Sequence, residues 1–445
     1  ISTVYLTKLY DASTVVQAAD LQTMTNLVGG ESLTLTGTSS IANANVGVKT
    51  VNTGGFTLND EVGANASSGG LASNYILSGG THQLTINQRP LNATLSRQYD
   101  GTATSAGSTL SSFDALQGGE TLTMSGSGTA ASVNVANGIA MSSNGDLGLV
   151  DGTGLASNYS LNSTVINITQ RVLNSSGSKT YDANTNALAA DITLSNLVSG
   201  ETLNHSGTAT LSSANAGSYT ISNLTGMSIA DNAGLASNYT LTGGTHNFTV
   251  NQKAISLSGT RLYDATTDAV ASDLTTISGR VGSETLTLSG TGSVADANVA
   301  PNKTVTVGTL ALGDGTGLAA NYTLSGGTHQ LTVDQAPISF TGTRTYNATT
   351  NVEVANITLT GQQGGEDLTV TGVGSITSGN VGSGKTANVT GLTIGDGVSG
   401  TPGTATNYTF TGGTQTFDVT QAQLTISGSR EYDGTVNFDN SIITV

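Results

Sequence analysis

Residues 261–266 read Arg261-Leu262-Tyr263-Asp264-Ala265-Thr266, and this stretch belongs to a pattern that recurs along the chain. The pattern is a basic residue, any residue, a tyrosine, and then an aspartate or asparagine. Its Tyr-Asp or Tyr-Asn pairs are Tyr10-Asp11, Tyr99-Asp100, Tyr181-Asp182, Tyr263-Asp264, Tyr346-Asn347 and Tyr432-Asp433, preceded by Lys8, Arg97, Lys179, Arg261, Arg344 and Arg430. The tyrosines are 89, 82, 82, 83 and 86 residues apart. Internal repetition of this kind decides the architecture.

Three further marks keep the same phase. An Asn-Tyr pair lies at Asn74-Tyr75, Asn158-Tyr159, Asn238-Tyr239, Asn321-Tyr322 and Asn407-Tyr408. A glutamate follows glycine or serine at Glu31, Glu120, Glu201, Glu284 and Glu366, and a closing glutamine lies at Gln88, Gln170, Gln252, Gln335 and Gln421. We predict repeats at 1–88, 89–170, 171–252, 253–335 and 336–421, with the start of a sixth at 422–445. Each complete unit is large enough to have its own core.

Within a repeat the apolar residues alternate with polar ones. The alternation is clear over residues 283–288, 303–307 and 330–334. A period of two in Thr-, Val- and Leu-rich segments predicts strands with one buried face, and Gly-rich clusters between them predict turns. Six or seven short strands per repeat favour an all-β fold: a tandem array of small β-sandwich-like domains, Ig-like or β-grasp-like.

The boundaries between repeats lack the Gly/Ser or Pro run of a mobile linker. At Asn251-Gln252-Lys253-Ala254, for example, one repeat passes directly into the next. With about ten strand residues per repeat at ~3.3 Å each, every repeat would advance ~30–40 Å. We therefore expect an elongated, stiff rod on the order of 150–200 Å for five repeats.

The composition limits the classes of partner that the chain could bind and the kinds of site that it could form. The 445 residues contain 13 Lys+Arg and 29 Asp+Glu, a formal charge of −16, which argues against nucleic acid or an anionic membrane surface as a partner. Cysteine is absent, so disulfides, thiolate metal sites and a cysteine nucleophile are excluded. No run of about 18 apolar residues is present and Ile1 does not open a signal peptide, so no membrane insertion is expected.

The repeated residues have structural interpretations. Eleven of the 13 tyrosines lie in the two Tyr motifs, which is typical of core side chains with the hydroxyl bonded at the rim. The motif Asp is expected to cap a turn, a role that Asn347 preserves without the charge. The basic residue is expected to keep its head in solvent. We also predict that it pairs with the Glu of its own repeat, for ~0.2–1 kcal/mol if exposed.

Catalytic and metal sites find little support. Oxygen-rich loops near Asp151, Asp231, Asp314 and Asp396 leave calcium as a minor alternative. Each loop has one carboxylate, however, and the loop length varies, so no cofactor and no metal ligand is predicted. His82, His246 and His329 occupy the same place in three repeats, which we interpret as sheet surface. No carboxylate pair or nucleophile motif is present, so we predict no catalytic residues and no enzyme, and we assign no ligand-binding residues.

The ensemble of marks resembles the YDG-type repeats, related to MBG modules, of large bacterial surface adhesins of the filamentous-haemagglutinin-like class. The resemblance rests on the basic-x-Tyr-Asp-Gly/Ala-Thr opening, the Gly-Gly-Glu and the Leu-Ala-x-Asn-Tyr stretch. It implies an extracellular β-rich stalk at a bacterial cell surface, exported by two-partner secretion, that holds an adhesive tip for attachment or biofilm formation. Two alternatives stay open: the repeats bind glycan or matrix polysaccharide by avidity, or they associate with like chains into filaments. The expected partners are neighbouring repeats, and extracellular polysaccharide or like chains.

Overall fold

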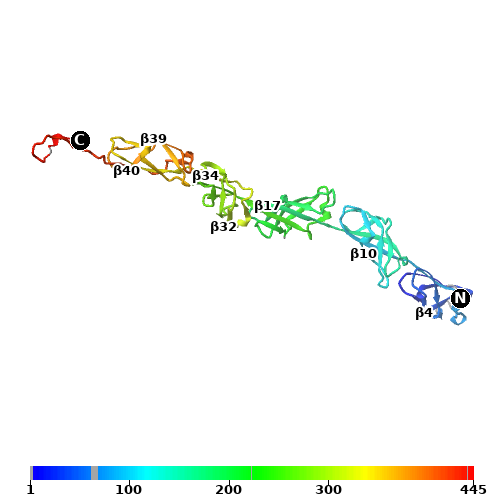
Figure 1. Cartoon of the computed structure of the whole chain (residues 1–445). Coiled ribbons are helices and arrows are strands. Elements are labelled where there is room, and N and C mark those ends of the chain that lie inside the picture. The colour runs from blue at the N-terminus through cyan, green and yellow to red at the C-terminus, as the bar shows by residue number, and fades with distance from the viewer. Residues whose placement is uncertain (1–3, 62–68, 222, 438) are drawn as a thin grey trace. The chain divides into compact units, whose positions relative to one another are not determined.

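The computed structural model describes residues 4–61, 69–221, 223–437 and 439–445 (Figure 1). The described chain is built from β-strands and three-residue 3-10 turns, arranged as tandem repeats with curled sheets. The predicted all-β array of β-sandwich-like domains is therefore confirmed. No helix in the described part of the chain has the length and apolar character needed to cross a membrane.

The second repeat illustrates the topology. Its elements are β8 (Arg89–Gln98), β9 (Thr104–Ala106), η4 (Gly107–Thr109), β10 (Leu110–Phe113), β11 (Leu122–Ser125), β12 (Ser127–Ala130), β13 (Ala136–Ser143), β14 (Gly148–Asp151), η5 (Ala156–Asn158) and β15 (Tyr159–Thr169). One sheet has the order β10-β8-β15-β13-β12-β9, and β11 pairs with β14. The first and last strands, β8 and β15, run parallel from Arg89↔Tyr159 to Gln98↔Thr169, and the neighbouring pairs are antiparallel.

The first and fifth repeats have the corresponding strand order, β2-β4-β5-β7-β1-β3 with β6 on β4, and β37-β39-β40-β43-β36-β38 with β41 on β39. The elements of the first are β1 (Val4–Leu9), β2 (Val15–Gln17), η1 (Ala18–Asp20), β3 (Leu21–Met24), η2 (Val28–Gly30), β4 (Leu33–Ile41), β5 (Gly47–Asn52), β6 (Phe56–Asp60), η3 (Ala72–Asn74) and β7 (His82–Asn87). Those of the fifth are β35 (Ala336–Pro337), β36 (Ser339–Thr345), β37 (Asn351–Glu353), η9 (Val354–Asn356), β38 (Ile357–Thr360), β39 (Leu368–Ile376), β40 (Gly382–Asn388), β41 (Leu392–Asp396), η10 (Ala405–Asn407), β42 (Tyr408–Thr409) and β43 (Gln415–Thr420).

In the third and fourth repeats the chain follows the same course, but its strands are shorter and more numerous. The third contains β16 (Arg171–Val172), β17 (Asn174–Thr180), β18 (Asn186–Leu188), η6 (Ala189–Asp191), β19 (Ile192–Ser195), β20 (Asn204–Thr210), β21 (Gly217–Thr220), β22 (Met227–Ala230), η7 (Ala236–Asn238), β23 (Tyr239–Thr240) and β24 (His246–Asn251). The fourth contains β25 (Lys253–Ala254), β26 (Ser256–Leu262), β27 (Asp268–Val270), β28 (Thr276–Ser278), β29 (Leu286–Ser289), β30 (Thr291–Ser293), β31 (Ala300–Thr304), β32 (Ala311–Asp314), η8 (Ala319–Asn321), β33 (Tyr322–Thr323) and β34 (His329–Asp334). Beyond the fifth repeat lie β44 (Ser427–Gly428), η11 (Asn440–Ile442) and β45 (Ile443–Thr444).

One predicted strand of the fourth repeat is shorter than expected. The alternation over 303–307 predicts a strand to Val307, whereas β31 ends at Thr304. The backbone then bonds two partners: Val305 N donates to His329 O at 2.9 Å, and Thr306 bridges Ser293. The chain therefore changes pairing partner at this point, which alternation alone does not reveal.

The strands of consecutive repeats are separated by one residue, the closing glutamine. β7 ends at Asn87 and β8 begins at Arg89, and the same single-residue step follows β15, β24 and β34. The buried core passes across this step. One cluster joins Tyr10, Val16, Ile41, Val51, Leu84 and Ile86 of the first repeat with Leu91, Leu122 and Tyr159 of the second. The first two repeats therefore share one buried cluster at this boundary.

The packing of the chain defines two compact units, and their division lies inside the third repeat. The first unit contains Ile1–Gly177, Ala187–Thr210 and Thr220–Phe248, and the second contains Ser178–Asn186, Leu211–Tyr219 and Thr249–Val445. We call the boundary between two consecutive repeats a joint. The first and second joints lie within the first unit, and the third and fourth lie within the second unit.

Candidate functional site at the repeat joints

Each joint is centred on a glutamate that accepts two tyrosine hydroxyls. At the third joint, Tyr181 follows directly after β17, and its hydroxyl donates to Glu284 Oε1 at 2.7 Å. The hydroxyl of Tyr322, the first residue of β33, donates to Oε2 of the same carboxylate at 2.5 Å. The two rings meet edge to face, with centroids 5.4 Å apart and an interplanar angle of 80°. This arrangement is favourable for aromatic quadrupoles.

The same cluster occurs at all four joints. In every case Oε1 of the glutamate binds the tyrosine of the preceding repeat, and Oε2 binds the tyrosine of its own repeat. The three other clusters are Tyr10–Glu120–Tyr159 (2.5 and 2.6 Å), Tyr99–Glu201–Tyr239 (2.5 and 2.6 Å) and Tyr263–Glu366–Tyr408 (2.6 and 2.5 Å). The first-motif tyrosine and the glutamate thus belong to one site, although they lie about 100 residues apart in sequence.

The glutamate carboxylate is closely surrounded. The Tyr322 hydroxyl, besides donating to Glu284, accepts from Val281 N at 3.0 Å. A Cβ at Gly317 would lie 2.5 Å from Glu284 Oε2, so only glycine fits at this position. Gly154, Gly234 and Gly403 make equally close approaches to Glu120, Glu201 and Glu366. The glycine that ends the loop after each of Asp151, Asp231, Asp314 and Asp396 therefore makes room for the joint carboxylate.

The asparagine of the Asn-Tyr pair forms a second layer of the joint. Asn321 accepts from Ala216 N at 2.8 Å and donates to Asn215 Oδ1 at 3.0 Å, both in the preceding repeat. Asn321 is 1% exposed. Asn158, Asn238 and Asn407 make the same two bonds to Asn45-Val46, Asn134-Val135 and Asn298-Val299. A buried amide that makes both bonds fixes the relative register of the two segments.

The closing glutamine contributes a third bond. Gln252 Nε2 donates to Ala320 O, in the 3-10 turn of the next repeat, at 3.0 Å. Gln88, Gln170 and Gln335 donate to Ser157 O, Ser237 O and Thr406 O in the same way. Next to it, the residue after the glutamine pairs in parallel with the joint tyrosine, as Lys253 does with Tyr322. The chain connection and the side-chain cluster thus lie at the same place.

Burial and the carboxylate raise the pKa of the joint tyrosines. Burial is the larger cause, because it disfavours the phenolate, and the hydrogen bond to the glutamate adds to it. The pKa rises to about 12 at Tyr159, Tyr181, Tyr239 and Tyr263. It is raised also at Tyr10, Tyr99, Tyr322 and Tyr408. The phenols therefore hold their protons more tightly in the joint than in the unfolded chain.

The predicted pairing of the basic residue with the glutamate of its own repeat is wrong. Arg261 forms an ion pair with Asp264, three residues further on, while Glu284 binds the two tyrosines. Lys8, Arg97, Lys179 and Arg430 pair with Asp11, Asp100, Asp182 and Asp433 in the same way. The head of Arg261 is not in solvent either, since its side chain is 6% exposed. The turn after the strand brings the i+3 carboxylate closer than any other acid.

The motif Asp also caps the turn, and the next residue is in the left-handed region. Asp264 Oδ1 accepts from Thr266 N at 2.9 Å, and Asn347 accepts from Thr349 N at 3.1 Å. Ala265 has φ +62° and faces the next repeat, where a Cβ at Gly364 would lie 2.8 Å from its methyl group. The close contact with the next repeat leaves room only for a small residue, and the positive φ favours glycine, so alanine adopts this conformation at a cost in backbone strain.

Replacing Asn347 by Asp should stabilise the fifth repeat. Arg344 is 7% exposed, and among the described residues its guanidinium bonds only neutral oxygens, those of Thr349 and Asn351, whereas its counterparts have a carboxylate. We expect a gain of ~0.2–1 kcal/mol that shrinks in high salt, measured as slower hydrogen exchange of the Thr349 amide. Asn347→Ala, which removes the cap, should instead cost ~1 kcal/mol. Equal effects of the two substitutions would contradict this assignment.

The three histidines are buried, so their interpretation as sheet surface is wrong. His82, His246 and His329 are 4–6% exposed, and Nε2 of each lies 2.7–2.8 Å from the carbonyl oxygen five residues earlier. The ring thereby closes the Gly-Gly-Thr turn before the last strand. In the fifth repeat Gln415 Nε2 donates to Phe410 O in the same place. Strand alternation had placed the histidine on one face but could not identify which face is covered.

This equivalence predicts which substitutions the site accepts. His329→Gln should change the free energy of unfolding by less than about 1 kcal/mol, because the amide reaches the same carbonyl. His329→Leu should cost more, about 1–1.5 kcal/mol, because Leu324 O then loses the ring donor and keeps only the Gly327 amide, at 3.2 Å. Hydrogen exchange of β34 in the full chain measures both. A leucine variant as stable as the glutamine variant would show that the bond contributes nothing.

The aspartates considered for calcium have backbone partners. Asp314 Oδ1 accepts from Ala319 N at 2.7 Å and thus caps η8. Asp60, Asp151, Asp231 and Asp396 accept from Ala72, Ala156, Ala236 and Ala405 N. Within the described residues no group of three or more His, Cys, Asp or Glu side chains could hold a metal ion.

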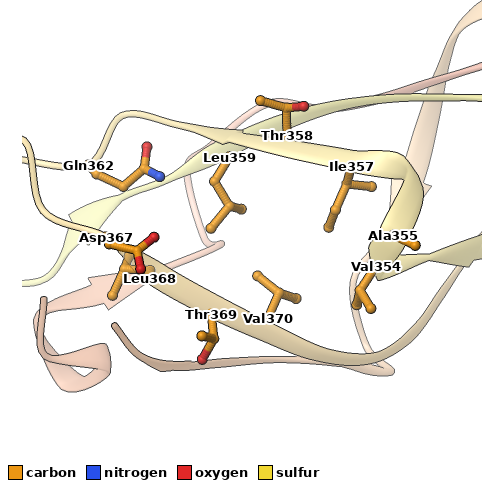
Figure 2. Close-up of a pocket in the computed structure, with 10 residues that line it drawn as sticks. All are labelled: Val354, Ala355, Ile357, Thr358, Leu359, Gln362, Asp367, Leu368, Thr369 and Val370. Atoms are coloured by element: carbon orange, nitrogen blue, oxygen red, sulfur yellow. The ribbon is translucent and has the colours of Figure 1, made fainter. Parts of the chain in front are cut away.

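A cleft of about 480 Å³ opens in the fifth repeat, between β38 and β39 (Figure 2). Ile357, Leu359, Leu368 and Val370 face into it, and Asp367 lies at one end (Figure 2). Val370 is the fourth residue after the joint glutamate, a place that Met124 and His205 occupy in other repeats. His205 bonds the carbonyls of Ala189 and Ile192 across this space. The cleft is therefore the gap left by a shorter side chain.

Sequence reasoning identified the tyrosines, glutamates and Asn-Tyr pairs as marks of the repeat but missed that they meet across the joint. It also missed the partner asparagines Asn45, Asn134, Asn215 and Asn298. A signal for these was present: each precedes valine or alanine and keeps the phase of the other marks. Asn380-Val381 continues the series in the fifth repeat.

The fold and the joints define a tandem array of β-sandwich-like domains. A model of the YDG domain matches residues 1–83, 81–166, 167–248, 245–330 and 328–417. These five matches cover most of the chain, and the protein belongs to the YDG domain family. No curated protein matches the chain.

Two solved structures are among those that match this chain. Drosophila N-cadherin EC1-4 is 9% identical, with 75% of this chain and 99% of that chain covered and a TM-score of 0.14. The N-terminal eight Ig domains of Down Syndrome Cell Adhesion Molecule are 8% identical, with 86% and 60% covered and a TM-score of 0.14.

Proposed function

We propose that this chain is the stalk region of an extracellular bacterial adhesin, a structural and not a catalytic part, that holds an adhesive tip away from the cell surface. Membership of the YDG family supports an adhesin-like repeat region. The acidic, cysteine-free composition agrees with an exported chain that folds without disulfides. In this role the array would provide length and stiffness.

The observation that carries the proposal is the content of the joints. Each joint has one connecting residue, one Tyr–Glu–Tyr cluster and one Asn–Asn pair, as at Gln252, Glu284 and Asn321. A flexible linker would need several residues free of such bonds. A connection of one residue with buried bonds on both sides resists bending, which a stalk requires. Export by two-partner secretion and a role in attachment or biofilm formation are part of the same proposal.

Small-angle X-ray scattering of the 445-residue chain tests the stalk. We expect a largest dimension on the order of 150–200 Å and the scattering of a stiff rod. A variant with Glu120, Glu201, Glu284 and Glu366 replaced by alanine should become more flexible and lose the rod signature. A compact or freely jointed particle in the unchanged chain would overturn the proposal. Retention of glycans on an array by the same chain would favour binding repeats over a spacer.

A further inference from the structure

The first and last long strands of a repeat are direct neighbours, and they run in the same direction. In the second repeat β8 and β15 pair over ten positions, from Arg89↔Tyr159 to Gln98↔Thr169. The same parallel pair is formed by β1 and β7, by β26 and β34, and by β36 and β43. We call this pair the terminal ladder. Because its strands are parallel, the chain enters a repeat at one end of the ladder and leaves it at the opposite end.

The terminal ladder continues past the end of its first strand. In all five repeats the amide of the first-motif tyrosine donates to the carbonyl of the residue that ends the last strand. These bonds join Tyr10 to Asn87 (3.0 Å), Tyr99 to Thr169 (2.9 Å), Tyr181 to Asn251 (2.8 Å), Tyr263 to Asp334 (2.8 Å) and Tyr346 to Thr420 (2.9 Å). The exit end of the ladder is therefore closed by a further backbone bond in each repeat.

The ladder also lies in the interior of the sheet. In the second repeat β10 covers the outer edge of β8, and β13 covers the outer edge of β15. Leu95 and Ile166, which face each other across the ladder, are both 0% exposed. Neighbouring strands and core side chains thus limit the access of water, which would otherwise replace the ladder bonds as they stretch.

A single residue connects one terminal ladder to the next. β7 ends at Asn87 and β8 begins at Arg89, so only Gln88 lies between them. One residue spans at most ~3.3–3.6 Å when fully extended. There is consequently no length of linker that could extend first, and a pull along the chain passes directly from the last strand of one repeat to the first strand of the next.

We propose that the repeats bear tension, with the terminal ladder as the element of each repeat that resists it. A force that draws the two ends of a repeat apart acts along the ladder and in opposite directions on its two strands. The bonds between the ten paired positions of β8 and β15 are then loaded together and must break together. In an antiparallel hairpin, which the chain enters and leaves at the same end, the bonds open one after another. The biological role of this resistance rests on the proposed stalk function, because a tip attached to a surface pulls on its stalk.

Pulling on the second repeat of the 445-residue chain in two directions tests the proposal. The sequence has no cysteine, so two introduced cysteines define where the force is applied. Pro90→Cys with Thr169→Cys holds the ladder at opposite ends, and Gln98→Cys with Thr169→Cys holds it at the same end. All three side chains are exposed. In single-molecule force spectroscopy at one loading rate, we expect a severalfold higher unfolding force for the first pair, because forced unfolding is governed by the barrier along the direction of pull.

Thermal unfolding without force is the control. The two double variants should have the same transition midpoint, so that a difference in force reflects the direction of pull and not the stability of the repeat. Equal forces in the two directions would overturn the proposal, and so would a higher force for the pair held at the same end.

Pulling the unchanged chain by its ends gives a second readout. Each unfolding event should lengthen the chain by about 230–270 Å, the extended length of an 82-residue repeat less its folded advance. Smaller steps would show that parts of a repeat yield separately, which contradicts a single resisting ladder. A failure in either experiment leaves the scattering of the unloaded chain unchanged, so it is distinguishable from a failure of the proposed stalk function.

Discussion

Replacing Glu284 by alanine should open the third joint. The substitution removes the acceptor of two buried tyrosine hydroxyls, Tyr181 and Tyr322, each of which then costs about 1–3 kcal/mol of desolvation. We expect a local loss of about 3–5 kcal/mol, because bonds to a charged acceptor are at the strong end of the range. Hydrogen exchange should accelerate by about a hundredfold or more at the Ala216 amide, which bonds Asn321 across this joint, and at the Val281 amide, which bonds the Tyr322 hydroxyl.

The first repeat provides the matched control. Glu31 has the same place in its repeat but binds only Tyr75 among the described tyrosines. Measured in dilute solution, Glu31→Ala should cost about 1 kcal/mol, the value of one hydrogen bond. Glu284→Gln should lie between the two alanine variants, because the amide fills the same space but can accept from only one hydroxyl. Equal losses for Glu31→Ala and Glu284→Ala would show that the joint adds nothing beyond the repeat.

The same substitution should change how the chain unfolds. Neighbouring repeats that share a buried cluster unfold together, because each repeat gains stability from the interface with its neighbour. The core that joins Ile86 to Leu91 and Tyr159 is such an interface. Loss of one cluster should therefore broaden the denaturant transition or split it in two. A transition of unchanged width and midpoint would indicate that each repeat is stable by itself.

The fold could be predicted from sequence because its signals are local. Alternation in segments such as 330–334 and the Gly-rich turns are read within ten residues, and the structure places β34 there. The turn cap at Asp264 is equally local, since its partner Thr266 is two residues away. Such interactions leave their pattern in adjacent positions.

The joint could not be predicted because a periodic sequence does not show whether two recurring positions of the pattern meet within one repeat or across two consecutive repeats. Glu284 has the same phase relation to Tyr263 of its own repeat as to Tyr181 of the preceding one, shifted by a single period. Alternation identifies which residues share a face but not which repeat covers that face. The burial of Tyr181 against Glu284 is a tertiary property, decided by the parallel pairing of Lys253 with Tyr322. The prediction of a pair between Arg261 and Glu284 failed for this reason.

Raising the pH into the alkaline range should open all four joints together. The unfolded tyrosine has a pKa of about 10, and burial beside a glutamate raises the pKa of Tyr159, Tyr181, Tyr239 and Tyr263 to about 12. A raised pKa means that the folded joint binds the phenol proton more tightly than the unfolded chain does. The joint tyrosines therefore contribute their full stability below pH ~10, and this contribution is lost as the pH rises from ~10 through ~12.

Absorbance at the tyrosinate band, recorded with circular dichroism, follows this transition. We expect the joint tyrosines to ionise late and together with the loss of β-structure, because a phenolate next to the glutamate carboxylate repels it in a site with little water. Tyr263→Phe keeps the ring contact with Tyr408 and removes one proton from the transition, whereas Tyr346→Phe lies outside the four joints and should leave the midpoint unchanged. Ionisation of all tyrosines at about pH 10 with the fold intact would contradict the buried Tyr–Glu–Tyr cluster, and the coupling of the repeats with it.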